Sequence, residues 1–156
     1  MAAARLDPTP IIDAVGPYAD TVATLEDRAA GYRDMIGFLP PRVEARLHLT
    51  GALDPTILDM QEKVRTHAIE NSAFDPKQTQ LMLFGMLVVE LSDAAFMHGV
   101  AARKAGATWA ELQSVVNLAY VFRGVSAANR GAEFIAKIID RERAAAGAAA
   151  STPTPN

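Results

Sequence analysis

The chain has 156 residues, of which 50% are hydrophobic and 21% are charged, a composition typical of a compact globular domain. Fifteen basic and eighteen acidic residues give a net charge of −3 without any basic cluster, so nucleic acid is not an expected partner. The chain contains no cysteine, which excludes disulfides, thiolate metal sites and cysteine nucleophiles.

The longest apolar run, from Leu81 to Val89, is much shorter than the roughly 20 residues that span a bilayer. The first residues of the chain lack the apolar core of a secretory signal. We therefore expect no membrane association and a cytoplasmic location.

Helical periodicity and helix punctuation recur along the chain, and no segment alternates apolar and polar residues as a half-buried strand does. These patterns predict an all-α fold of about six helices. Both ends of the chain are poor in large apolar side chains. We predict a mobile N-terminus over 1–11, a single folded domain over 12–143 and a disordered tail over 144–156.

Glycine and proline residues delimit three predicted helices in the first half of the chain, over about 18–36, 41–50 and 55–71. The longest helix follows Asp75, which with Gln78 forms a capping-box pattern, and is predicted to continue to about Ala105. Its segment from Leu81 to Leu91 has no polar face, so we expect it to be buried inside the domain or in a subunit interface.

A second capping-box pattern, Thr108 with Glu111, begins the next predicted helix, which ends at Gly124. Ser126 is expected to cap the last helix, which becomes an alanine-rich tail after Arg143. No internal repeat and no second domain are visible in the sequence.

The sequence indicates neither a metal site nor a nucleotide site. His48, His67 and His98 have none of the spacings to each other or to glutamate that helical metal ligands show. The glycines stand singly, as helix ends, and do not form a phosphate-binding loop.

His98 is the main candidate for chemistry. Alanines at 94, 95, 101 and 102 surround it at one-turn spacing, and such small neighbours leave room for a cavity beside a titratable ring. The same alanines also fit a close helix contact in which His98 only hydrogen-bonds a carbonyl group. Both interpretations are open from the residues alone.

Two carboxylates precede His98 on the predicted long helix. Glu90 would lie about 12 Å away along the axis, and Asp93 would point about 140° away, so neither would orient the ring. An unpaired Glu90 after an apolar stretch would be costly, which makes this carboxylate either a surface or interface charge or a site residue.

The next predicted helix carries three further polar candidates. Asn117 and Tyr120 share one face at three-residue spacing. Arg123 lies in the last turn, where a cation is favoured by the helix dipole and where a guanidinium could also bind a substrate carboxylate.

Three stretches carry a resemblance to a known family: 75–79, His98 to Thr108 followed by Glu111, and Ala119 to Asn129. Phe74 to Ala136 as a whole resembles the carboxymuconolactone decarboxylase family, whose superfamily includes alkylhydroperoxidase D. The resemblance implies an alkylhydroperoxidase D-like helical bundle that assembles into homotrimers or homohexamers, with sites at or near subunit interfaces.

The sequence departs from the family's pattern at several positions. The peroxidase branch has cysteines seven and four residues before the motif histidine, where this chain has Leu91 and Ala94, so peroxidase chemistry is excluded. Ala94 also stands where the decarboxylase branch typically has an acid. Ser126 replaces the usual proline, and Arg123 occupies a position that is generally small.

The resemblance implies a decarboxylase-like lyase that needs no metal or organic cofactor. It would act on a small acidic lactone or related aromatic ring-cleavage product, with His98 as general acid and base. The candidate substrate-binding residues are Arg123, Asn117, Tyr120 and Glu90. Two alternatives stay open: a non-catalytic oligomeric binding or structural member of the family, or another proton transfer, such as lactone hydrolysis or aldol-type cleavage.

Overall fold

The computed structural model describes residues 6–150, and within this range all regular secondary structure is α-helical, as predicted. The chain divides after Ala73 into two compact units. The described range contains eight helices, more than the six predicted, because 9–15 forms a helix and the long predicted helix is interrupted. The predictions for residues 1–5 and 151–156 lie outside the described residues.

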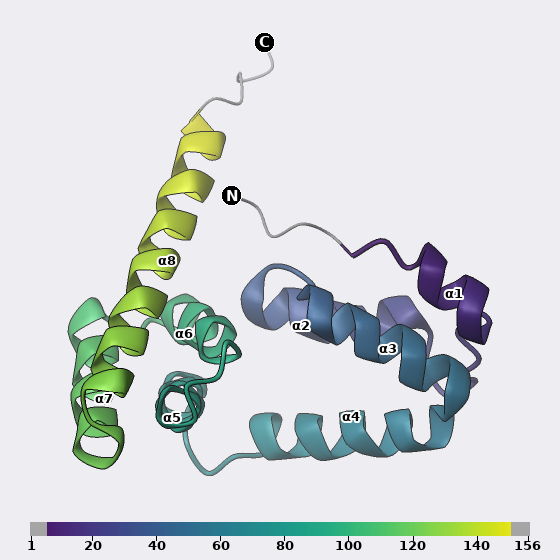
Figure 1. The fold of residues 1–156 in the computed structure, drawn as a ribbon, viewed down its shortest axis with the longest axis horizontal. Coiled ribbons are helices and arrows are strands. Elements are labelled where there is room, and N and C mark those ends of the chain that lie inside the picture. Colours follow the sequence, from purple (N-terminus) through teal and green to yellow (C-terminus); the bar gives the residue numbers. More distant parts are fainter. Residues whose placement is uncertain (1–5, 151–156) are drawn as a thin grey trace. The chain divides into compact units, whose positions relative to one another are not determined.

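The first unit contains α1 (Thr9–Val15), α2 (Leu25–Ile36), α3 (Pro41–Leu53) and α4 (Pro55–Glu70), and each of the other three packs against α3 (Figure 1). Asp54 forms the corner between α3 and α4. It ends α3, and its carboxylate accepts a hydrogen bond of 3.0 Å from the Ile57 N–H at the start of α4.

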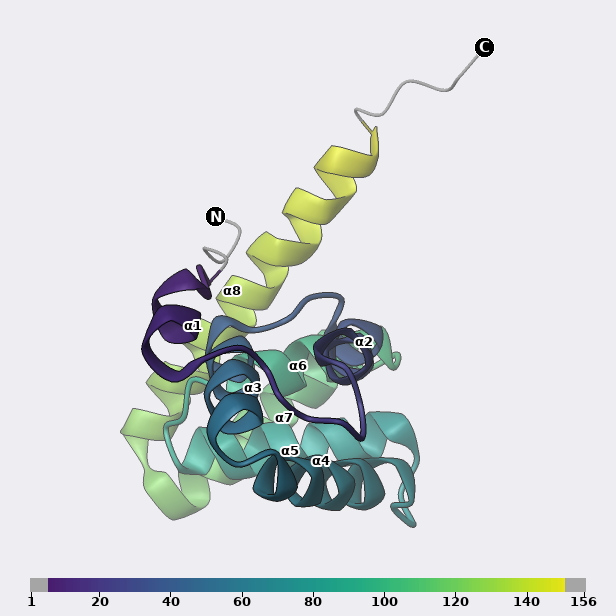
Figure 2. The same cartoon turned by 90° about the vertical axis from the view of Figure 1, so that its right-hand side faces the viewer.

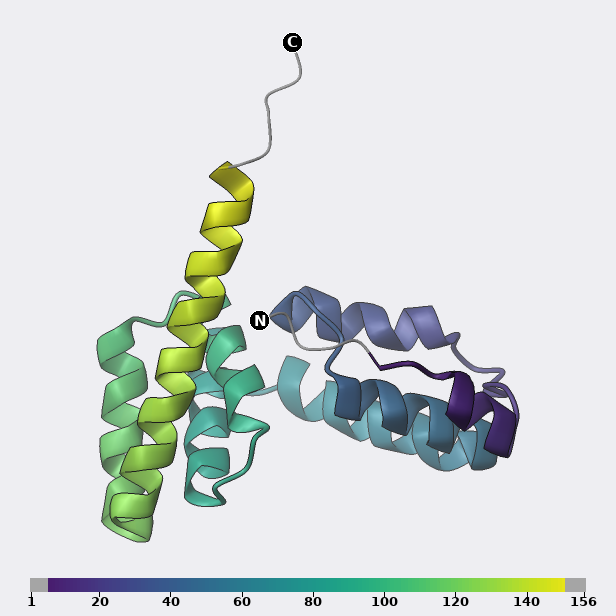
Figure 3. The same ribbon diagram turned by 45° about the horizontal axis from the view of Figure 1, so that its top comes forward.

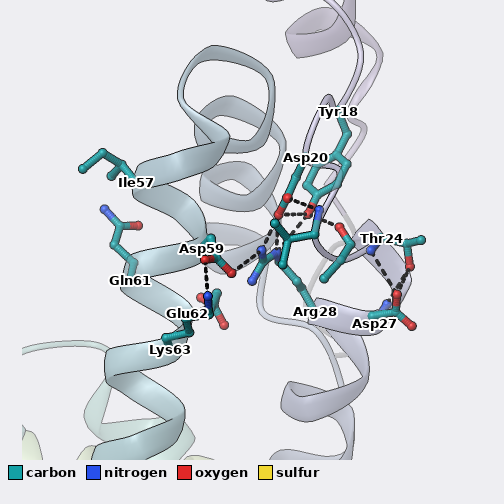
Figure 4. Close-up of polar contacts among 12 residues, drawn as sticks. Tyr18, Asp20, Thr24, Asp27, Arg28, Ile57, Asp59, Gln61, Glu62 and Lys63 are labelled. Carbon is teal, nitrogen blue, oxygen red and sulfur yellow. Dashed lines mark hydrogen bonds and ion pairs between the residues drawn. The ribbon is translucent and has the colours of Figure 1, made fainter.

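Charged side chains occupy much of the interior of the first unit. Arg28 of α2 forms an ion pair with Asp20 and also reaches Asp59 of α4 at 3.4 Å (Figure 4). The Asp20 carboxyl is buried, which raises its pKa, but hydrogen bonds from Val22 and Arg28 outweigh that effect and the net pKa is lowered. Asp20 is therefore held as a carboxylate.

A second buried cluster joins α2, α3 and α4. The Tyr32 hydroxyl donates to Glu62 at 3.0 Å and accepts from Arg46 at 2.8 Å, while Arg46 forms an ion pair with Glu62. The Arg65 guanidinium lies over the Tyr32 ring, 4.1 Å from its centre. Ionic contacts thus link the helices of this unit around a few apolar side chains.

The second unit contains α5 (Pro76–Val89), α6 (Ala95–Lys104), α7 (Trp109–Arg123) and α8 (Val125–Ala150). α5 packs against α6 and α7, and α8 packs against α7 and α6 (Figure 3). Its core is apolar and comes from all four helices, with the following residues almost fully buried: Phe84, Val88, Ala95, Ala102, Leu112, Val116, Phe134 and Ile138.

The predicted continuous helix from 76 to 105 is wrong. The chain turns after Val89 through a Schellman motif, in which the Leu91 N–H donates to the Val88 carbonyl at 3.0 Å and the Ser92 N–H donates to the Leu87 carbonyl at 2.9 Å. Leu91 takes the left-handed conformation, with φ of 55°, that usually belongs to glycine. α6 therefore folds back onto α5.

Four of the predicted helix starts are confirmed, at Pro41, Pro55, Pro76 and Trp109. The first predicted helix, over about 18–36, begins only at Leu25, and Ser126 lies inside α8 and does not precede it. Thr108 and Glu111 form both bonds of a capping box at α7. Asp75 caps α5 by accepting from the Gln78 N–H at 2.7 Å, but within residues 6–150 the Gln78 side chain does not return a bond. α8 continues through 144–150, where a disordered tail was predicted, and extends beyond the other helices of its unit (Figure 2).

Candidate active site

His98 of α6 is joined to Gln80 of α5 by a hydrogen bond of 2.8 Å between the imidazole Nδ1 and the amide Oε1. Gln80 is only 4% exposed, and His98 is half-buried. A buried side-chain amide therefore fixes the orientation of the imidazole ring.

This pairing depends on the turn after Val89. Residues 80 and 98 would be about 27 Å apart on one continuous helix. The turn brings α6 alongside α5. Gly99 lets α6 pack closely against α8, because a Cβ atom there would lie 2.5 Å from Ile138 Cδ1, and the same atom would lie 3.4 Å from Phe84 of α5. Most of the alanines around His98 serve this packing: Ala95, Ala101 and Ala102 are buried.

The two carboxylates near the turn behave differently from each other. Glu90, the C-cap residue of α5, is exposed and has no side-chain hydrogen bond or ion pair within the described range. The expected cost of burying it therefore does not arise. Asp93 forms an ion pair with Arg130 of α8, so it connects the segment between α5 and α6 to the last helix.

The three polar candidates of α7 lie on its exposed surface. The Asn117 Oδ1 accepts a hydrogen bond of 2.9 Å from Gln113 Nε2. Tyr120 and Arg123 are exposed, and within residues 6–150 none of the three has a hydrogen bond to His98. The structure thus unites His98 with Gln80, and it does not unite His98 with Glu90 or with these residues of α7.

A groove of about 380 Å³ runs between α5 and α7. Apart from Gln78 its lining residues are apolar: Leu81, Met82, Gly85, Met86, Val89, Val115, Leu118, Ala119 and Phe122. Leu118 is 66% exposed and Phe122 is 83% exposed. Within the described chain this stretch is therefore not buried on all sides, because α5 turns Phe84 and Val88 to the core and Met82 and Met86 to the groove. Its burial in a subunit interface, the other alternative, stays a prediction.

A salt bridge outside the groove joins the first turns of α5 and α7. Lys77 Nζ lies 2.7 Å from Glu111 Oε1. This bond, together with the hydrogen bonds from Thr108, lowers the pKa of Glu111 to about 2. Both side chains are partly exposed, so the pair positions the helix ends without forming a buried charge.

Sequence reasoning missed Gln80, because a continuous helix would have kept it far from His98. One signal could have found it, because Thr79 and Gln80 are polar residues directly before the apolar stretch of α5. The structure shows that both are buried. No group of three or more His, Asp or Glu side chains suited to a metal ion is present in the described part of the chain. Likewise, none of the described helices is long and apolar enough to cross a membrane.

A family model, described as that of the carboxymuconolactone decarboxylase family, matches residues 55–137, more than half of the chain. The chain belongs to this family. No curated protein and no solved structure gives a match. In this carboxymuconolactone decarboxylase family member, the matched range contains both residues of the hydrogen-bonded pair, Gln80 and His98, together with all the candidate residues of α7.

Proposed function

We propose that this protein is a cofactor-free lyase of the cytoplasm that decarboxylates a small acidic lactone or a related product of aromatic ring cleavage. His98 is the general acid and base. The observation that carries the proposal is the 2.8 Å hydrogen bond between His98 and buried Gln80, because it holds a titratable ring in one orientation within the family's matched segment.

The reaction needs one well-placed proton donor. The bond between the ring carbon and the carboxylate breaks, carbon dioxide leaves, and the electron pair moves into the conjugated carbonyl group as a dienolate. The His98 imidazolium gives its proton to the carbon and regains one from water. Histidine is suited to both steps, because it is the side chain that most often serves as general acid and base.

Substrate binding is assigned to Arg123, Asn117, Tyr120 and Glu90. The Arg123 guanidinium would bind a substrate carboxylate, and Asn117 or Tyr120 would hold the enolate oxygen. All four are exposed in the single chain. We therefore propose that the α7 residues complete the site of a neighbouring copy in a homotrimer or homohexamer.

The groove between α5 and α7 supports this assembly. It combines an apolar lining with the highly exposed Leu118 and Phe122, and an apolar surface of this kind is expected to be covered by another protein surface. A second copy of the chain is the proposed occupant.

The activity is tested with 4-carboxymuconolactone, the lactone after which the family is named, by following product formation with proton NMR. We expect the wild type to release carbon dioxide, and His98→Ala to lose about 10²- to 10⁴-fold in rate. The matched control is His67→Ala, because His67 is exposed on α4 and its imidazole Nδ1 pairs with the Asn71 side chain at 3.2 Å.

Each alternative function has its own result in this experiment. Ring opening without carbon dioxide would indicate lactone hydrolysis, and binding without any product would indicate a non-catalytic member of the family. Equal rates in wild type and His98→Ala would remove His98 from the chemistry.

The assembly is tested by analytical ultracentrifugation of Leu118→Lys against Val64→Lys. Val64 lies on α4 and is 69% exposed, close to the 66% of Leu118. We expect wild type and Val64→Lys to sediment as trimers or hexamers and Leu118→Lys to sediment as smaller species. A monomeric wild type would contradict the proposal.

A further inference from the structure

We infer that Gln80 selects the working nitrogen of His98 by holding the ring in the tautomer whose proton is on Nδ1. Gln80 is thus a positioning residue that acts through His98. The catalytic meaning of this inference depends on the proposed function, but the tautomer itself is a property of the resting protein.

The first step is the direction of the hydrogen bond. An amide oxygen only accepts, so Oε1 at 2.8 Å requires an N–H group on Nδ1. In the neutral ring the lone pair is then on Nε2. In the imidazolium both nitrogens carry protons, and the bond to Gln80 is unchanged. The proton that the ring gains and loses is therefore the one on Nε2.

The second step is that Gln80 is buried, so the hydrogen bond with His98 lies away from water. The side chain is 4% exposed, and its neighbours Thr79 and Phe84 on α5 are also buried. The Thr79 hydroxyl is directed to the Phe74 carbonyl at 3.4 Å, at the start of the same helix. With the amide in this orientation, the Nε2–H tautomer would place two acceptors, Nδ1 and Oε1, 2.8 Å apart with no proton between them, and a buried hydrogen bond left unmade costs about 1–3 kcal/mol.

The third step concerns charge. A carboxylate in place of the amide would stabilise the imidazolium and raise the pKa of the ring. Gln80 accepts the same hydrogen bond without a net charge, so it does not add the ionic stabilisation of the imidazolium that a carboxylate would give. An uncharged partner also does not repel a negatively charged substrate, which agrees with an acidic lactone.

The test is nitrogen NMR of the full-length protein labelled with ¹⁵N-histidine, titrated from pH 5 to pH 9. The His98 signals are assigned by their absence in His98→Ala. We expect the neutral wild-type ring to show a protonated Nδ1 and an unprotonated Nε2. Gln80→Met removes the acceptor at similar volume and is expected to shift the ring toward the Nε2–H tautomer. Gln80→Glu is expected to raise the titration midpoint by about one unit or more.

The matched control is Gln78→Met, the same change two residues earlier on α5, where the side chain is exposed at the groove. It should leave both His98 nitrogen shifts unchanged. A wild-type ring with its proton on Nε2 would overturn the inference, and so would a Gln80→Glu midpoint equal to that of wild type. Neither the wild-type tautomer nor the Gln80→Glu titration midpoint requires Gln80→Met to fold.

The NMR result also separates this inference from the proposed function. An Nδ1–H tautomer in a protein that leaves the lactone untouched would support the inference and contradict the lyase. Decarboxylation by a protein whose His98 is in the Nε2–H tautomer would support the lyase and contradict the inference.

Discussion

Gly131 of α8 packs directly against Val116 of α7, so that a Cβ atom at position 131 would lie 2.5 Å from Val116 Cγ2 and 2.6 Å from Cγ1. A similar approach occurs at Gly85, where a Cβ atom would lie 2.8 Å from Val115 Cγ1. The helices of the second unit can therefore approach closely because glycines lie at their contacts. The β-branched side chain of Val116, which faces Gly131, has little freedom to move away.

Gly131→Ala is expected to destabilise the second unit by about 1–3 kcal/mol through overpacking, although alanine favours the helix by about 1 kcal/mol. Urea unfolding followed by Trp109 fluorescence measures this, because Trp109 is the single tryptophan and lies in the same unit. Gly147→Ala on the same helix meets nothing within 4 Å and should be neutral or stabilising. Equal stability of the two variants would contradict the packing argument.

Glu62→Gln is expected to destabilise the first unit at pH 7 by about 1–3 kcal/mol, because it removes a charged hydrogen-bond acceptor from Tyr32 and Arg46. Burial raises the pKa of Glu62, but Arg46 and Arg65 outweigh it and the net pKa is lowered below 4.5. Because the pKa of Glu62 is lower in the folded state than in the unfolded state, its carboxylate stabilises the fold at pH values above the unfolded-state pKa. This stabilisation is lost as the pH falls through the folded-state pKa.

The difference in urea stability between wild type and Glu62→Gln should therefore be largest at pH 7 and should shrink below about pH 4.5. Hydrogen exchange at pH 7 should locate the change to peptides of α2, α3 and α4. Glu26→Gln, which disrupts an exposed pair with Arg33, is the control and should have little effect. A difference that stays constant with pH would show that the charge of Glu62 is not the cause.

The carboxyl group of Glu111 is expected to titrate near pH 2 in a ¹³C NMR experiment, because Lys77 and the Thr108 hydrogen bonds favour its ionised form. Lys77→Met should move the midpoint upward, toward the ordinary value of 4.5. Lys137→Met should not, since Lys137 pairs with Glu133. A wild-type midpoint near 4.5 would mean that the salt bridge is not formed in solution.

Much of the fold could be predicted because its helix starts have clear local signals. Asp75 and Thr108 cap α5 and α7 as the sequence indicates. The end of α5 could not be predicted, because its left-handed residue is Leu91, which has a Cβ atom and gives no glycine signal. The packing of α6 onto α5 determines the left-handed conformation of Leu91. This packing involves residues far from Leu91 in the sequence, so a local sequence pattern does not reveal it.

The candidate site was predictable only in its central residue. His98 was identified from its small neighbours and from the family resemblance. Its partner, Gln80, required knowledge of the turn, because 18 residues separate the two in sequence and a single hydrogen bond joins them in space. None of the four predicted substrate-binding residues has a hydrogen bond to His98 within residues 6–150, and their role in binding stays a prediction.

The ion pair between Asp93 and Arg130 ties the residues that separate α5 from α6 to the last helix. Arg130 also lies over the Phe134 ring, 4.7 Å from its centre, so its position is fixed within α8. We therefore expect the pairing of Gln80 with His98 to depend on a helix that contributes neither of them. In a random mutagenesis map, substitutions that disturb this pairing should include changes of Arg130, although that residue lies on neither α5 nor α6.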